Sequence, residues 1–93
     1  MAISFPESVD IIEMLPRDGL QRFDEFVPTE EKIEIIDQLS TTGVTEIEVS
    51  SFTHPDMVPT LRDAEEVFAG IERHDDVTYR ALVPNEYGME RAV

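Results

Sequence analysis

The sequence predicts an α/β fold: a partial (β/α)8 barrel, made of its first three strand–helix units with the third helix truncated. Short β-branched or alternating apolar runs are separated by longer segments of helical apolar spacing, which is typical of parallel βαβ units. Successive strand starts lie about 35 residues apart, and this spacing suits the barrel. A doubly wound sheet is the competing architecture, but the first loop lacks the glycine-rich fingerprints of nucleotide-binding folds. We expect residues 1–8 to be a flexible lead-in and residues 9–93 to form the barrel segment.

The first unit begins with a β-branched run at residues 9–14 (VDIIEM). This predicted strand ends before Pro16, because proline cannot continue a central strand. A loop then leads to Thr29, which is expected to cap a helix whose first turn carries two glutamates. Apolar residues recur at helical spacing to about residue 42, and Gly43 provides a stop signal.

The second and third units follow the same plan. Residues 45–50 (TEIEVS) alternate strictly between polar and apolar, which predicts a strand with one apolar face. After a proline-containing loop at residues 51–59, an apolar stripe predicts the second helix. Residues 77–83 predict the third strand, and a third helix begins near Tyr87. The stripe of the second helix consists of Leu61, Ala64, Val67, Phe68 and Ile71.

The charge of the chain narrows the classes of partner. The 93 residues include 21 acidic and 7 basic side chains, for a net charge of −14. Such a chain repels phosphate backbones and anionic membranes, so we expect neither nucleic acid nor a membrane as partner. Dispersed acids with a single lysine are typical of proteins adapted to multimolar salt, and an ordinary acidic protein is the alternative. Without an apolar span or a signal-peptide pattern, the cytoplasm is the expected location.

Polar residues follow each of the three predicted strands, where parallel α/β folds carry their functional groups. Asp18 and Glu48 offer hard oxygen ligands that suit Mg²⁺ or Mn²⁺. Arg17 could stabilise an oxyanion developing on a substrate carbonyl. The Arg-Asp-Gly triplet also fits an ordinary turn with a local ion pair. Glu48 is the stronger candidate, because a carboxylate near the end of a buried strand more often serves function than packing.

Three motifs resemble the hydroxymethylglutaryl-CoA lyase family, part of a superfamily of metal-dependent lyases and Claisen-condensing enzymes. They lie in order at residues 16–21 (PRDGLQ), 48–59 (EVSSFTHPDMVP) and 82–85 (LVPN), each at the end of a predicted strand. The resemblance covers residues 9–93. Leu20 favours the lyase branch, since isopropylmalate, citramalate and homocitrate synthases typically carry glutamate at that position.

The resemblance implies roles for five residues. Asp18 corresponds to a ligand of the divalent metal cation, Mg²⁺ or Mn²⁺, and Arg17 to the arginine that binds the substrate carbonyl and stabilises the enolate. Glu48 corresponds to a catalytic glutamate, and Gln21 and Asn85 match positions near the substrate. The implied reaction is carbon–carbon cleavage of an acyl-CoA substrate, 3-hydroxy-3-methylglutaryl-CoA, to acetyl-CoA and acetoacetate by a retro-Claisen step.

The chain departs from that family in length. A full family barrel is about three times longer, and its histidine pair, asparagine ligand and catalytic cysteine lie beyond residue 93. We therefore expect an amino-terminal third that is inactive alone. The alternatives are a piece of a related condensing enzyme and a non-enzymatic half-barrel module. Two open strand edges and an apolar interior face would favour a homo-oligomer or self-associating fragment.

Overall fold

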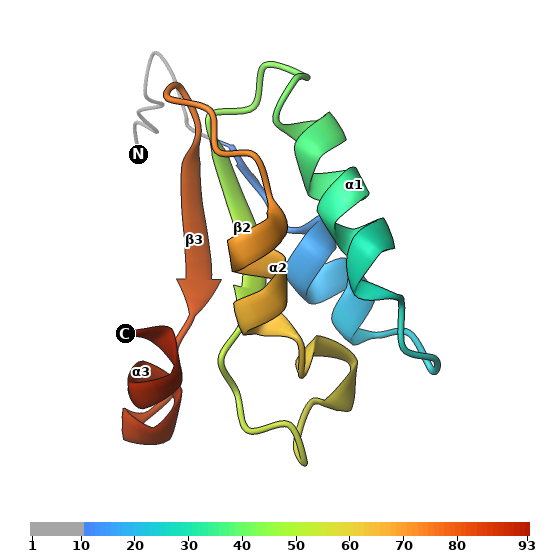
Figure 1. Ribbon diagram of the computed structural model, residues 1–93, viewed down its shortest axis with the longest axis vertical. Helices are drawn as coiled ribbons and strands as arrows, with labels where there is room; N and C mark the ends of the chain where they lie inside the picture. Colours follow the sequence, from blue (N-terminus) through green and yellow to red (C-terminus); the bar gives the residue numbers. More distant parts are fainter. Residues whose placement is uncertain (1–10) are drawn as a thin grey trace, which may run out of the picture.

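The computed structural model describes residues 11–93 of the chain. The predicted lead-in at 1–8, and the start of the first predicted strand at 9–10, lie outside the described residues. Strands and helices alternate as the sequence predicts (Figure 1). The described elements are β1 (Ile12–Glu13), a π-helical turn (Leu15–Gly19), α1 (Thr29–Leu39), β2 (Glu46–Ser51), a 3₁₀ turn (Pro59–Leu61), α2 (Ala64–Gly70), β3 (Thr78–Leu82) and α3 (Glu86–Ala92).

The three strands form one parallel sheet in the order β1-β2-β3. Ile12 pairs with Glu46, and Glu48 pairs with Arg80 in the next strand. The register shifts between Glu48 and Ser50, where β2 carries one extra residue. Sequential parallel strands joined through helices confirm the predicted βαβ order.

One face of the sheet packs against α1 and α2 and forms the core (Figure 1). Ile47 and Val49 of β2 are fully buried there against Ile36 of α1 and Val67 of α2. Each such side chain contributes roughly 1.5–3 kcal/mol to folding when it leaves water. The members of the predicted second stripe are all buried or packed on other apolar side chains. The helix itself is shorter than predicted, because Leu61 lies in the 3₁₀ turn and Ile71 follows the last residue of α2.

The opposite face of the sheet carries charge. The strict alternation of β2 turns Glu46 and Glu48 away from the helices, and Arg80 Nη1 donates to Glu46 Oε2 at 3.1 Å. For these strands the expectation of an apolar interior face is therefore wrong. The reason is the alternation along β2: the apolar residues point to the face covered by the helices, so the glutamates between them point to the opposite face.

Two predicted helix signals differ in the structure. Thr29 is the first residue of α1 and not its cap, because its hydroxyl donates to Asp63 Oδ2 at 2.7 Å. The helix ends at Leu39, earlier than predicted, and the chain turns to Gly43, whose φ of 94° is easy for glycine. Pro16 lies in a π-helical turn where a loop was expected. None of the helices within residues 11–93 combines the length and apolarity needed to cross a bilayer.

Candidate functional site

The turn after β1 places two of the predicted site residues. The backbone amides of Arg17, Asp18 and Gly19 all donate to the carbonyl of Met14, at 3.2, 2.8 and 3.3 Å. Pro16 is tolerated because it stands at the start of the turn, where no amide is needed. Single π-helical turns are rare and are often found at functional sites. This single hydrogen-bonded turn holds both side chains just beyond the end of the strand.

Arg17 and Glu48 form the central contact of the site. Arg17 Nε donates to Glu48 Oε1 at 2.6 Å, and the two side chains are only 16% and 15% exposed. Such a charge-assisted hydrogen bond is short and strong. The contact joins β2 to the turn after β1, so the two predicted catalytic residues are brought together. The contact also explains how a mostly buried carboxylate is tolerated on β2, because Glu48 is paired with the Arg17 guanidinium.

Asp18 lies beside this pair and remains 43% exposed. Its carboxylate accepts from Arg22 Nη2 at 3.3 Å, and its other oxygen lies 3.7 Å from Arg17 Nη1. Within residues 11–93, no three His, Asp or Glu side chains gather into a set that could hold a metal ion. Glu48 is already bound to Arg17, so Asp18 is the carboxylate of this site that could serve as a hard oxygen ligand. The described residues of the site therefore do not provide a complete coordination shell for a divalent cation.

The structure separates the two other predicted site residues from this contact. Gln21 follows the turn and lines a cavity of about 440 Å³ between the loops that follow β1 and β2. Asn85 caps α3, since its side-chain oxygen accepts from the amide of Gly88 at 3.0 Å. Asn85 therefore has a structural role in ordering α3.

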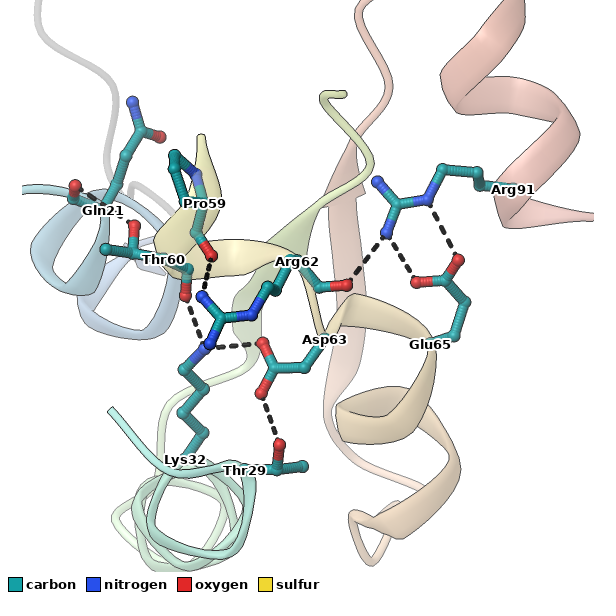
Figure 2. Close-up of polar contacts among 9 residues, drawn as sticks. All are labelled: Gln21, Thr29, Lys32, Pro59, Thr60, Arg62, Asp63, Glu65 and Arg91. Atoms are coloured by element: carbon teal, nitrogen blue, oxygen red, sulfur yellow. Dashed lines mark hydrogen bonds and ion pairs between the residues drawn. The ribbon is translucent and has the colours of Figure 1, made fainter. Parts of the chain in front are cut away.

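Sequence reasoning missed two cations that bind the loop after β2. Lys32 is buried and donates to Asp63 Oδ1 at 2.6 Å and to the carbonyl of Thr60 at 2.6 Å (Figure 2). Arg91 of α3 binds Glu65 at the start of α2. The sequence offered one signal for the role of Lys32, because it is the single lysine in a chain whose other six basic residues are arginines. Arg91 carries no such signal, because its partners lie far away in the sequence.

The sequence comparisons agree with the motifs. Residues 8–93 match the HMGL-like family model. The chain is 52% identical over 89 residues to the hydroxymethylglutaryl-CoA lyase YngG of Bacillus subtilis, covering 96% of this chain and 30% of that protein. It is 50% identical over 88 residues to a rat 3-hydroxy-3-methylglutaryl-CoA lyase, covering 95% of this chain and 26% of the relative. The chain thus spans about 30% of the length of the relatives it matches.

A solved structure supports the same assignment. The HMG-CoA lyase of Acinetobacter baumannii, in complex with coenzyme A and 3-methylmalate, superposes with a TM-score of 0.89 at 48% identity. The superposition covers 98% of this chain and 30% of that one. The three parallel strands are therefore part of a (β/α)8 barrel, which confirms the predicted fold class. Because the family model matches nearly the whole chain, the chain belongs to the HMGL-like family.

Proposed function

We propose that the full-length protein containing this segment cleaves 3-hydroxy-3-methylglutaryl-CoA to acetyl-CoA and acetoacetate. The observation that carries this proposal is the Arg17–Glu48 contact of 2.6 Å beside the half-exposed carboxylate of Asp18. The relatives that share this segment at 52% and 50% identity are lyases named for this substrate. The 93 residues alone are proposed to be inactive, because they span a minor part of such an enzyme.

The residues of this chain divide the work. Glu48 accepts from Arg17 Nε, which fixes the guanidinium plane and leaves the Nη groups free to donate to a substrate oxygen. In that position Arg17 would bind the substrate carbonyl and stabilise the enolate oxygen as carbon–carbon cleavage proceeds. Asp18 would contribute one oxygen ligand to Mg²⁺ or Mn²⁺, whose chemistry when bound is to polarise substrate oxygens as a Lewis acid.

Gln21 and Asn85 are proposed to lie along the bound acyl-CoA. Gln21 lines the cavity next to the turn that carries Arg17. Asn85 uses its side-chain oxygen to cap α3, and its amide nitrogen could still donate to substrate. Coenzyme A bound to the Acinetobacter baumannii relative supports an acyl-CoA ligand for the whole protein.

The environment and assembly of the chain are part of the same proposal. The net charge of −14 and the single lysine support a cytoplasm rich in salt. Circular dichroism should then show more ordered structure in molar KCl than in dilute buffer.

In the described sheet, β1 and β3 each have one edge without a neighbouring strand, which supports self-association. Sedimentation as a compact monomer would contradict that part.

A chimeric barrel tests the activity. Residues 9–93 would replace the matching segment of the Bacillus subtilis relative, with the intact relative as reference for folding and turnover. We expect cleavage of the substrate by the chimera. In the chimera, Arg17→Lys should keep metal affinity and lower kcat, because the planar fork is lost. Asp18→Asn should weaken metal binding, because a charged ligand becomes neutral.

Arg73→Lys is the matched control, because it makes the same replacement at an exposed arginine that does not contact Glu48. Arg73→Lys should leave both the metal affinity and the kcat of the chimera unchanged. A chimera that folds and binds metal like the relative but does not cleave the substrate would contradict the proposed function.

A further inference from the structure

A single side chain of α3 reaches both ends of the segment that joins β2 to α2, which we call the β2–α2 loop (residues 52–63). Arg91 Nη1 donates to the carbonyl of Thr53 at 2.9 Å, near the start of this loop. Arg91 Nη2 donates to the carbonyl of Arg62 at 3.4 Å, near its end (Figure 2). The guanidinium thus spans the loop and fixes the separation of its ends.

Glu65 holds the guanidinium in this position. Its two carboxylate oxygens accept from Arg91 Nε at 3.0 Å and Nη2 at 2.6 Å, so the pair is bidentate. The Arg91 side chain is only 11% exposed. The hydrogen bonds from Arg91 lower the pKa of the Glu65 carboxyl, and those to Glu65 raise the pKa of Arg91. The planar guanidinium of Arg91 is bound by the Glu65 carboxylate and by the two loop carbonyls, so it has little freedom to move away from the loop.

Close packing of α3 on the loop supports the same clamp. A Cβ atom added at Gly88 would lie 2.7 Å from the carbonyl oxygen of Phe52, so the helix approaches the loop backbone directly. The rings of His54 and Tyr87 stack with centroids 4.7 Å apart. The loop is therefore positioned by α3 through backbone, ring and charge contacts together.

The far side of the β2–α2 loop contacts the segment that carries the candidate site. Thr60 Oγ1 donates to the carbonyl of Gln21 at 3.3 Å, and Lys32 Nζ holds the carbonyl of Thr60 at 2.6 Å (Figure 2). Gln21 lies two residues beyond the π-helical turn that presents Arg17 and Asp18, separated from it by Leu20. A displacement of the loop would therefore move the end of this turn.

We infer that Arg91 is a positioning residue: through the β2–α2 loop and Thr60, it sets the alignment of Arg17 with Glu48. Arg91 acts on the loop and Thr60 on the turn, and neither needs to touch substrate. That this alignment matters for catalysis rests on the proposed function. The alignment itself can be measured without turnover, so a failure of either claim can be told from a failure of the other.

Hydrogen exchange of the Arg17 Nε–H group, followed by NMR in the 93-residue chain, tests the inference. Arg91→Met removes the fork and keeps most of the side-chain volume. We expect the exchange rate at Arg17 to rise about tenfold, as expected when a charge-assisted hydrogen bond loses its support. Arg73→Met is the matched control, because both arginines donate to a carbonyl and lie over a phenylalanine ring. The centroid of Phe68 is 5.7 Å from the Arg73 guanidinium, and that of Phe52 is 5.5 Å from the Arg91 guanidinium. Arg73→Met should leave exchange at Arg17 unchanged.

Thr60→Val tests the connection inside the loop while leaving every contact of Arg91 in place. It should accelerate exchange at Arg17 by itself, and adding Arg91→Met should then have little further effect. An unchanged rate in Arg91→Met, or an equal acceleration at amides throughout the chain, would overturn the inference. If Arg91→Met does not fold, Glu65→Gln replaces it, because it removes the charged partner that holds the Arg91 guanidinium. Faster exchange at Arg17 in that variant supports the relay, and an unchanged rate overturns it.

Discussion

The two faces of the sheet use the same strand for opposite purposes. On the helix-covered face, Ile47 and Val49 are buried among the apolar side chains of α1 and α2. On the open face, Glu46 and Glu48 form ion pairs with Arg80 and Arg17. A period of two along one strand thus separates folding from chemistry. The core forms within the described residues, whereas the charges of the open face lie on the side of the sheet that α1 and α2 do not cover.

The largest effect is expected on the covered face. Ile47→Ala should lower the free energy of unfolding by about 2–5 kcal/mol, because a fully buried side chain is replaced by a cavity. Ile11→Ala makes the same deletion at a residue that is 71% exposed, and it should cost less than about 0.5 kcal/mol. Urea unfolding followed by circular dichroism measures both. Similar small losses in the two variants would show that this face is not the core.

The next effect is expected at the inner pair of the open face. Glu48→Ala would leave the mostly buried guanidinium of Arg17 without its partner, at a cost of about 1–3 kcal/mol. The double variant with Arg17→Met should cost less than the sum of the single variants, because neither group is then left unpaired. Strict additivity in the unfolding free energies would contradict the contact as described.

A smaller effect is expected at the outer pair of the same face. Arg80 is about half exposed, so water and salt screen its bond to Glu46. Glu46→Ala should therefore lower the unfolding free energy by less than about 1 kcal/mol. The comparison with Glu48→Ala in the same urea series is the measurement. A larger loss for Glu46→Ala would mean that burial does not rank the two pairs.

The division between the faces could be predicted from the sequence, because strict alternation in β2 is a local signal. The positions of Arg17 and Asp18 after the first strand were also foreseeable, since the motif itself follows the apolar run. The Thr29 cap was predicted wrongly because Asp63, 34 residues away, takes its hydroxyl. No local rule contains such a partner, and the contacts of Arg91 with the β2–α2 loop were hidden for the same reason.

The smallest expected effect lies beyond the ends of the strands, where Arg91 clamps the β2–α2 loop. Arg91 lowers the pKa of Glu65 below its ordinary value of 4.5, so the folded chain binds fewer protons there than the unfolded chain. The contribution to stability is therefore present above pH 4.5 and is lost as the pH falls through the lowered pKa. Because Glu65 is half exposed, solvent screening limits this contribution to less than about 1 kcal/mol.

Glu65→Gln should remove this pH dependence, since the amide does not titrate. Urea unfolding at pH 7 and at pH 3 measures the difference, with Glu66→Gln as the matched control in the same turn of α2. The wild type and the control should lose slightly more stability on acidification than Glu65→Gln. If all three lose the same amount, the clamp contributes no pH-dependent stability, and Arg91 would hold the loop through its carbonyl bonds alone.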